Sequence, residues 1–315
     1  MNVAVVGATG IVGETILRVM EERGTPVEHL GLFASRAHNA AAEFRGATHD
    51  VMATTGTALR EYDAVFFAGG EEASERYAPE LVRSGRIVID NSSTFRMSPG
   101  IPLIVPEVNP HALRKEHRLL PVGNCTAIIL CVALAPIRDC AGLANVRVAT
   151  YQAVSGAGRA ILEEFESGSG PIVRNVIPRI GDLDEFGSSG EESKVRDETR
   201  KILELPKLPI AITAVRVPVR CAHSEAVFVE TVRDTSVEEL ARAFENARGI
   251  VYHADGIITP REVEGTDLVH VARLRSEDGS RRYFQLWVVG DQLRKGAATN
   301  GIQILELLLS RAGRQ

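Results

Sequence analysis

The first thirteen residues restrict the fold more than any other part of the chain. A short apolar run, Val3–Val6, stops at the glycine-rich segment GATGIVG, residues 7–13. Apolar residues at positions 16, 17, 19 and 20 then follow at the spacing of one helix face. A strand, a glycine turn and a helix in this order favour a dinucleotide-binding fold, because the glycines admit a pyrophosphate and the helix N-terminus donates N–H groups to it. The alternative is a tight strand-to-helix turn that binds no ligand.

More apolar strands follow in the first half of the chain, separated by segments with helical periodicity. They are Leu30–Ala34, Ala64–Ala68, Ile87–Asp90 and Leu103–Val105. Continuously apolar strands that alternate with amphipathic segments indicate a parallel sheet covered by helices on both faces. Ligands of such sheets bind at the carboxyl ends of the strands. We therefore expect an α/β protein with an N-terminal Rossmann-type domain.

Two loops at that sheet edge carry cationic side chains. Ser35 and Arg36 stand where a protein that prefers NAD often has an acidic residue. A hydroxyl beside a guanidinium suits a 2′-phosphate, so this pair favours NADP over NAD, the alternative being an arginine on the surface. Arg96 lies in the loop after Ile87–Asp90, and its position alone fits a phosphate ligand and a surface residue equally well.

The sequence around Cys125 is that of a thiol at the start of a helix. Asn124 and Cys125 come directly before a long apolar run, whose helix is expected to close at Pro136. At a helix N-terminus the dipole and the free N–H groups favour a thiolate. The same N–H groups, with the Asn124 side chain, are placed to stabilise an oxyanion. Cys131 lies within the apolar run and is expected in the core. Most single cysteines in cytosolic proteins are inert, so position alone favours an unreactive Cys125 over a catalytic one.

The second half of the chain changes to alternating strands and polar turns. A strand over residues 146–151 leads to Gln152 and to a second glycine turn, residues 155–158. A capping box at 189–192 opens a helix on which Glu191 and Lys194 share a face, and a surface ion pair is the simpler reading of those two. His223 follows an apolar run that contains Arg216. Since no histidine has metal-ligand spacing with a cysteine or another histidine, no metal site is predicted.

Composition narrows the class of protein. The chain has 315 residues, 44% of them hydrophobic and 24% charged, which suggests about two ordinary globular domains. A formal charge of −5 provides no basic field for nucleic acid. No apolar run reaches the ~18 residues that a membrane span needs, and the N-terminus lacks the features of a signal peptide. Four cysteines without disulfide-like spacing indicate a reduced, cytoplasmic protein.

Seven segments of the chain, taken together and in their order, resemble a known family, although no single motif among them would be sufficient. They are GATGIVG, DNSSTFRM with VPEVN, NCT, TYQAVSGAG, EESKVRDETRKIL, RVPVRCAHSE and GAATNGIQILELL. Together they resemble the aspartate-semialdehyde dehydrogenase family over nearly the whole chain. The resemblance implies an NADP-binding domain of residues 1–124 plus a C-terminal helix at 295–315, and an α+β catalytic and dimerisation domain at 125–294. It also implies a homodimer, with pairing of dimers into a tetramer left open.

The implied reaction is the reductive dephosphorylation of L-aspartyl 4-phosphate to L-aspartate 4-semialdehyde with NADPH, in the biosynthesis of lysine, threonine, methionine and isoleucine. Its partners are therefore a small-molecule substrate and phosphate. At the matching positions, Cys125 would form the acyl-thioester and His223 would act as acid and base. Gln152 would orient the substrate, and Asn124 would support the site beside the sulfur.

The resemblance assigns binding roles as well. Arg216 would bind the substrate carboxylate and Glu191 its amino group, while Arg96 and Lys194 would bind phosphate. Ten residues would contact the cofactor: Gly7, Thr9, Gly10, Ile11, Val12, Ser35, Arg36, Ser155, Gly156 and Asn300.

The chain departs from the family pattern beside the nucleophile, where Gly123 and Thr126 replace the usual Pro and Ser. Residues 37–39 also replace the Ser-Ala-Gly run that often follows the expected 2′-phosphate site. Two alternatives remain. The sibling N-acetyl-γ-glutamyl-phosphate reductase shares the thioester chemistry, but an acidic Glu191 suits a free amino group better than an acetylated one. A nucleotide-binding homologue without catalysis would be expected to lose the nucleophile or the histidine, and both are present.

Overall fold

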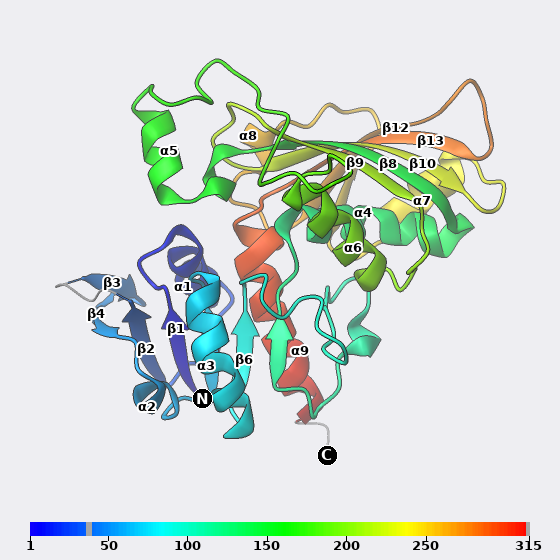
Figure 1. Ribbon diagram of the computed structural model, residues 1–315. Helices are drawn as coiled ribbons and strands as arrows, with labels where there is room; N and C mark the ends of the chain where they lie inside the picture. Colours follow the sequence, from blue (N-terminus) through cyan, green and yellow to red (C-terminus); the bar gives the residue numbers. More distant parts are fainter. Residues whose placement is uncertain (36–39, 313–315) are drawn as a thin grey trace. The chain divides into compact units, whose positions relative to one another are not determined.

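The computed structural model describes residues 1–35 and 40–312 of the chain (Figure 1). Its contacts divide the chain into two compact units, Met1–Gly123 with Ala297–Gln315, and Asn124–Gly296. Each unit has its own sheet and its own helices. The first unit is therefore made of two separate stretches of the sequence.

The first unit is built on a seven-stranded sheet with the order β3-β4-β2-β1-β5-β6-β7. Neighbouring strands pair in parallel, except β3 with β4, which are antiparallel. The strands are β1 (Asn2–Val6), β2 (His29–Ala34), β3 (Ala41–Phe44), β4 (Ala47–Ala53), β5 (Ala64–Phe67), β6 (Ile87–Asp90) and β7 (Leu119–Pro121). This mostly parallel sheet confirms the predicted Rossmann-type fold of the N-terminal half.

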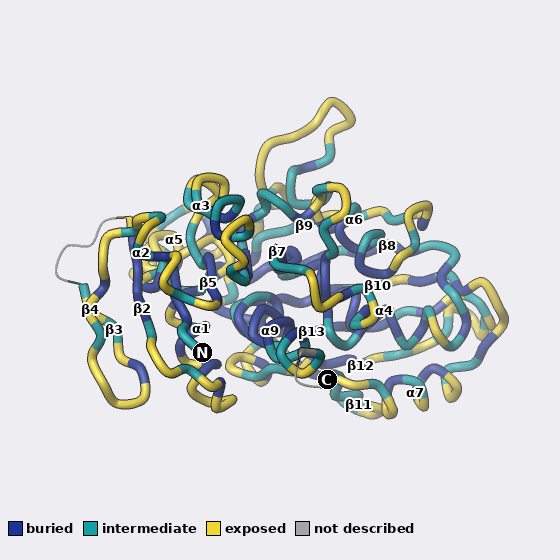
Figure 2. Tube along the Cα trace, turned by 90° about the horizontal axis from the view of Figure 1, so that it is seen from below, coloured by how far each residue is buried: buried dark blue, intermediate teal, exposed yellow. Residues whose placement is uncertain are grey.

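Helices cover both faces of this sheet. They are α1 (Ile11–Glu22), α2 (Gly56–Leu59), α3 (Glu71–Arg83) and α9 (Thr299–Ala312), with a short 3-10 turn η1 (Pro110–Ala112). Val65 and Phe67 of β5 share a core with α3, whereas Phe66 lies beside Gly301 of α9. Because successive side chains point to opposite faces and both faces are covered, every residue of β5 is buried (Figure 2).

The glycines at the start of the chain are there because the turn has no room for side chains. Gly7 has φ +84°, and a Cβ added to it would lie 2.7 Å from the backbone nitrogen of Gly69. A Cβ on Gly13 would lie 2.3 Å from the carbonyl oxygen of Gly7. Two glycines therefore bring β1, the start of α1 and the end of β5 into direct backbone contact.

The strand predicted at Leu103–Val105 is wrong. The segment is buried but irregular, and β7 instead occupies the position beside β6. Side-chain amides satisfy its backbone in place of a neighbouring strand. Asn109 Nδ2 donates to the Leu103 carbonyl (2.9 Å), and Asn300 Nδ2 donates to the Ile104 carbonyl (3.0 Å). The apolar run correctly indicated burial, but it could not reveal that distant amides replace the ladder.

The second unit contains a mixed six-stranded sheet with the order β11-β12-β13-β10-β8-β9. Only β11 with β12 and β8 with β9 are parallel. The strands are β8 (Leu143–Gln152), β9 (Ile210–Arg216), β10 (His223–Thr231), β11 (Ile250–His253), β12 (Val269–Ser276) and β13 (Tyr283–Gly290). A mixed sheet with separate helices is the α+β architecture expected for this half.

Three helices, α4 (Cys125–Ala141), α6 (Gly190–Ile202) and α7 (Val237–Glu245), lie along one face of that sheet (Figure 1). The remaining short elements are α5 (Arg159–Glu166), α8 (Pro260–Val263), a 3-10 turn η2 (Val154–Ala157) and a π-helical turn η3 (Arg294–Ala298). Helix α4 packs against α6, α7 and four strands, so it is buried almost all round. The capping box predicted at Ser189 and Glu192 is present at the start of α6.

Helix α4 does not close at Pro136, as the sequence suggested, but continues to Ala141. A proline inside a helix removes one backbone hydrogen bond. The residues beyond it keep the helix regular because they are buried: Ile137 is fully buried and Ala141 is 1% exposed. The helix ends instead at Gly142, whose φ of +74° is unfavourable for other residues.

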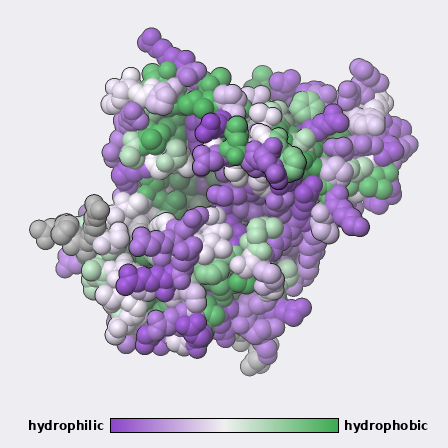
Figure 3. Space-filling model, in the orientation of Figure 1, coloured by the Kyte–Doolittle hydropathy of each residue, from purple (hydrophilic) through white to green (hydrophobic). Residues whose placement is uncertain are grey.

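The face of the molecule in Figure 3 mixes hydrophilic residues with smaller apolar patches. Within the residues that the structure describes, no helix combines the length and the apolar character that crossing a membrane would require.

Candidate active site

Cys125 is the first residue of α4, as predicted, and Asn124 is its N-cap. The Asn124 Oδ1 accepts hydrogen bonds from the backbone N–H groups of Thr126 (3.0 Å) and Ala127 (3.1 Å). These are the N–H groups that the sequence suggested for an oxyanion. Since Asn124 already occupies them, its side chain caps the helix and holds the turn that carries the sulfur.

His223 is the residue that faces the sulfur. It is the first residue of β10, it is fully buried, and its Nε2 lies 3.5 Å from Cys125 Sγ. The two residues are 98 positions apart in the chain. The antiparallel pairing of β10 with β8, together with the packing of α4 on both strands, brings them together.

A backbone hydrogen bond decides which ring nitrogen of His223 carries the proton. The N–H of Ala153 donates to Nδ1 at 3.0 Å, so Nδ1 must be unprotonated. In the neutral ring the proton is then on Nε2, the nitrogen that faces Cys125. His223 therefore directs an N–H donor at the sulfur.

The surroundings of His223 keep its ring neutral. Burial lowers the pKa of His223 well below its ordinary value of 6.5, and the nearby Arg216 lowers it further. Arg216 ends β9, where its Nη1 donates to the Ala153 carbonyl at 2.6 Å. Burial also lowers the pKa of Arg216, while Cys125 and Glu191 act in the opposite direction. A guanidinium stays charged even so, and Arg216 is therefore the fixed positive charge of this cluster.

Glu191 adds a negative charge on the side of α6. Its Oε1 accepts hydrogen bonds from Asn124 Nδ2 (3.0 Å) and Gln152 Nε2 (3.1 Å). Both bonds go to the same oxygen, so Oε2 can bind a cationic group. The structure thus brings together six predicted residues of one unit: Asn124, Cys125, Gln152, Glu191, Arg216 and His223.

Two glycines press against the reactive side chains. A Cβ on Gly156 would lie 3.1 Å from His223 Cε1 and 3.2 Å from Arg216 Nη1. A Cβ on Gly296 would lie 2.7 Å from Cys125 Cβ. Neither position has room for a side chain without displacing one of these groups, so both glycines help to fix the geometry around Cys125.

The other three cysteines lack this setting, and two of them are buried. Burial raises the pKa of Cys221 to about 12, and the pKa of the fully buried Cys131 is raised further. Both are therefore thiols at neutral pH. Cys140 is partly exposed near the far end of α4, 3.9 Å from the Thr235 hydroxyl. Only Cys125 combines a helix N-terminus with an N–H donor from a histidine.

The expected phosphate ligands belong to different units. Lys194 is exposed on α6, one turn after Glu191. Arg96 lies in the first unit, in the loop after β6, where its Nη2 donates to the Asn91 carbonyl at 2.9 Å. The structure does not place them relative to each other.

The first unit contains a cleft where the glycine turn meets the ends of β2 and β4. It has a volume of about 370 Å³, and the lining residues include Gly7, Ser35, Gly69, Gly70 and Arg76. A backbone with no room for Cβ atoms beside a cleft at the carboxyl edge of a parallel sheet fits a dinucleotide. Arg36, predicted at the 2′-phosphate, lies outside the described residues. Thr9, Gly10, Ile11 and Val12 follow Gly7 in the same turn, with Thr9 exposed.

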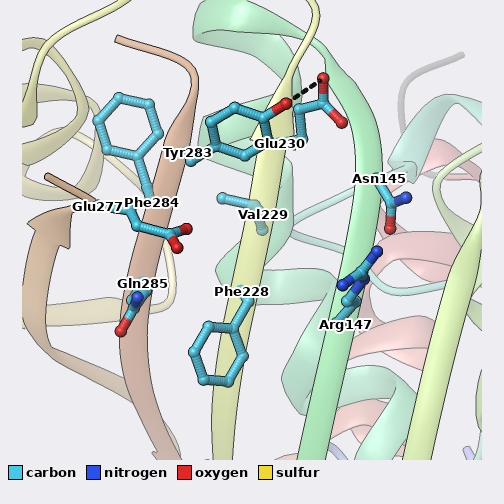
Figure 4. Close-up of a pocket in the computed structure, with 9 residues that line it drawn as sticks. All are labelled: Asn145, Arg147, Phe228, Val229, Glu230, Glu277, Tyr283, Phe284 and Gln285. Carbon is cyan, nitrogen blue, oxygen red and sulfur yellow. Dashed lines mark hydrogen bonds between the residues drawn. The ribbon is translucent and has the colours of Figure 1, made fainter. Parts of the chain in front are cut away.

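A second cavity, of about 280 Å³, lies on the open face of the other sheet (Figure 4). Phe228 of β10 stands opposite Arg147 of β8 and Gln285 of β13 there. Strand alternation puts Phe228 on the face opposite to His223, so this cavity is separate from the Cys125 cluster.

Sequence reasoning missed two buried residues beside the cluster. Gln292, in the loop after β13, bonds to both Ser155 and Ala222. Glu225 lies two residues after His223 and on the same face of β10, fully buried. Neither of its carboxyl oxygens has a hydrogen-bond partner among the described residues. The strand alternation of HSEAVFVET could have flagged Glu225 as inward-facing, whereas nothing in the sequence marks Gln292.

Glu225 makes stability depend on pH in a predictable direction. Burial raises its pKa well above the ordinary value of 4.5, so the folded protein keeps a proton that the unfolded chain releases. Stability is therefore lost as pH rises from about 4.5 through the folded-state pKa. We expect Glu225→Gln to melt above the wild type at pH 8, by roughly 2–4 °C per kcal/mol gained, and at nearly the same temperature at pH 5. Thermal melts at both pH values test this, and a variant less stable at pH 8 would contradict it.

Comparison with known proteins gives consistent matches over nearly the whole chain. Residues 2–116 match the family model described as "Semialdehyde dehydrogenase, NAD binding domain", and residues 134–295 match "Semialdehyde dehydrogenase, dimerisation domain". The aspartate-semialdehyde dehydrogenase of Aquifex aeolicus is 39% identical, with 98% of each chain covered.

Solved structures agree. The aspartate semialdehyde dehydrogenase II of Vibrio cholerae, complexed with ASA, has a TM-score of 0.93 at 38% identity, again covering 98% of both chains. The Candida albicans aspartate semialdehyde dehydrogenase with NADP shares the fold, with a TM-score of 0.79, 22% identity and 99% of both chains covered.

Proposed function

The chain belongs to the aspartate-semialdehyde dehydrogenase family, and we propose that it catalyses the NADPH-dependent reductive dephosphorylation of L-aspartyl 4-phosphate to L-aspartate 4-semialdehyde. The observation that carries this proposal is the 3.5 Å approach of His223 Nε2 to Cys125 Sγ, flanked by one fixed cation and one carboxylate. The proposed place of the reaction is the cytoplasmic biosynthesis of lysine, threonine, methionine and isoleucine.

Substrate recognition follows from the two opposite charges. Arg216, the fixed cation near Cys125, would bind the α-carboxylate of an amino acid through a two-pronged guanidinium contact. Glu191 keeps Oε2 for the ammonium group, while Gln152 and Asn124 hold its other oxygen. An N-acetylated substrate has no ammonium to pair with Glu191, so this arrangement favours aspartyl phosphate over the sibling reductase's substrate.

Cys125 and His223 supply the covalent chemistry. The Cys125 thiolate attacks the acyl carbon, a C–S bond forms, and phosphate leaves with the electrons of the C–O bond. NADPH, when held at the glycine turn that contains Gly7 and Gly10, would supply the hydride that reduces the thioester carbon. The C–S bond then breaks and its electrons return to sulfur, which regenerates the thiolate. At each stage the Nε2–H of His223 stabilises the negative charge on sulfur or oxygen.

This mechanism uses His223 as a hydrogen-bond donor that keeps its proton, in place of the acid–base role implied by the resemblance. Acting as a base would require an imidazolium with a proton on Nδ1, facing the N–H of Ala153. Burial and Arg216 also oppose that charge. A neutral donor meets every requirement of the steps above, because thiolate is both the attacking and the leaving group.

Cofactor and phosphate binding complete the proposal. Gly7, Thr9, Gly10, Ile11 and Val12 would hold the pyrophosphate, with Ser35 and Arg36 at the 2′-phosphate. Ser155, Gly156 and Asn300 would contact the remainder of NADP, as the resemblance implied. Arg96 and Lys194 would bind the departing phosphate. The cleft beside the glycine turn supports the cofactor assignment.

A homodimer is proposed through the second unit, with pairing into tetramers left open. The family model matched there is a dimerisation domain. The open face of its sheet exposes Phe228 and Tyr283 at the cavity, at 42% and 47% (Figure 4). Tyr151, on the strand next to Phe228, is 37% exposed. Exposed aromatic side chains around a cavity on an uncovered sheet face are typical of a protein interface.

An assay in the reverse direction tests the function. With aspartate semialdehyde, phosphate and NADP⁺, we expect NADPH formation that stops when phosphate is omitted and slows when NAD⁺ replaces NADP⁺. N-acetylglutamate semialdehyde is the matched substrate control and should react far more slowly. Faster turnover of the acetylated substrate would favour the sibling reductase, and no turnover of either would favour a non-catalytic homologue.

A further inference from the structure

Gln292 is a buried amide whose two ends bond to two different parts of the site. It is 2% exposed and lies between β13 and the π-helical turn η3. Its Oε1 accepts the backbone N–H of Ala222 at 2.9 Å, and its Nε2 donates to the Ser155 hydroxyl at 2.5 Å. Both bonds are made within the second unit.

The bond to Ala222 matters because Ala222 sets the entry of His223 into the sheet. Ala222 directly precedes His223 and has φ +67°, a left-handed conformation that alanine rarely adopts. It is fully buried, so its N–H needs a protein acceptor. Gln292 provides that acceptor and holds the backbone in the conformation that aims the imidazole at Cys125.

The bond to Ser155 connects the same amide to the second glycine turn. Ser155 is 2% exposed, and its backbone N–H donates to the Arg220 carbonyl at 3.1 Å. The next residue, Gly156, packs against both His223 and Arg216. Since Gln292 donates to the hydroxyl, the Ser155 proton points to a different acceptor, and the neighbouring Cys221 side chain is one such partner.

We propose that Gln292 is a positioning residue for His223, acting through the left-handed Ala222, and that it also orients the Ser155 hydroxyl. The reaction that this inference refers to is the one given under the proposed function. The hydrogen bonds that it describes do not depend on which reaction the protein catalyses. A buried glutamine with a purely structural role would affect folding stability without changing how His223 meets the sulfur.

The variant Gln292→Met tests this, since it keeps the approximate volume and removes both hydrogen bonds. We expect kcat to fall roughly 10–100-fold, in line with the cost of a small misplacement of a catalytic group, with a smaller change in the KM for aspartate semialdehyde. Alkylation of Cys125 by iodoacetamide should also slow, because the donor to the sulfur is misplaced. This readout needs no substrate, so it tests the inference even if the wild type does not act on aspartate semialdehyde.

A second substitution separates positioning from general destabilisation. Glycine adopts φ +67° without the help of Gln292. The double variant Ala222→Gly/Gln292→Met should therefore have a kcat and a Cys125 alkylation rate several-fold higher than those of Gln292→Met alone. Gln303→Met, on the half-buried Gln303 that donates to Glu107, is the matched control and should leave both rates unchanged.

Either of two results would overturn the inference. One is Gln292→Met with kcat and alkylation rate within about twofold of the control. The other is a double variant no faster than Gln292→Met, which would mean that the Ala222 backbone is not what Gln292 holds. If Gln292→Met does not fold, Gln292→Asn, which shortens the amide by one methylene, replaces it with the same expected direction and rescue.

Discussion

Replacing the nucleophile, Cys125→Ser, should lower turnover by at least about 10³-fold while leaving NADPH binding unchanged. A serine hydroxyl must lose a proton to attack, and the histidine nitrogen that faces it cannot take one. The Nε2 of His223 already carries a proton, because Nδ1 accepts the N–H of Ala153. A thiol ionises far more readily than a hydroxyl, and only the sulfur can therefore use a neutral donor as its partner.

Steady-state rates and NADPH fluorescence titration measure the two parts of that expectation. Cys140→Ser is the matched control, since Cys140 lies on the same helix, near the end opposite to Cys125, and is also partly exposed. It should retain wild-type turnover. Turnover of Cys125→Ser within tenfold of the wild type would rule out a thioester on Cys125.

Two substitutions of His223 should differ from each other by a large factor. His223→Met removes the donor and should reduce kcat about 10²–10³-fold, the usual cost of losing one oxyanion donor. His223→Gln places an amide N–H close to the position of Nε2 and should retain much more activity, at roughly a tenth of the wild type. Comparing kcat of the two variants under identical conditions tests the neutral-donor mechanism.

Equal losses in the two His223 variants would show that proton transfer, which glutamine cannot perform, is required. An independent check is the ¹⁵N spectrum of His223 in labelled protein. Because burial and Arg216 hold its pKa well below 6.5, the ring should keep the neutral pattern with the proton on Nε2 as pH falls through that value. A protonated ring at pH 6.5 would contradict both the geometry and the mechanism.

The sequence predicted the parts of this protein that depend on local chemistry. The glycine turn, the helix start at Cys125 and the capping box at Ser189 each need only a few neighbouring residues, and each is present. The cluster around Cys125 was reached through the resemblance to a family, because no local pattern joins Cys125 to His223 98 positions away.

What the sequence could not predict depends on partners distant in the chain. Pro136 is tolerated because the residues around it, such as Ile137 and Ala141, are buried, and Leu103–Val105 avoids a strand because two asparagine amides satisfy its backbone. The Asn124 side chain was expected to help an oxyanion, yet it bonds to its own helix and to Glu191. Gln292 gave no signal at all, since an amide with two buried partners looks like any other glutamine in the sequence.

The first unit is made of two separate stretches of sequence, and this affects how the chain folds while it is being synthesised. Residues Met1–Gly123 leave the ribosome before the second unit, but one face of their sheet is covered by α9, which is translated after the second unit. Ile302 and Leu305 of α9 are fully buried, and its Gly301 lies against Phe66 and Ile89. Until α9 emerges, the nascent chain carries a complete second unit behind an N-terminal sheet with an exposed apolar face. That surface is of the kind that chaperones bind, so the first unit, although most of it is made before the second, completes its fold only after the second has been synthesised.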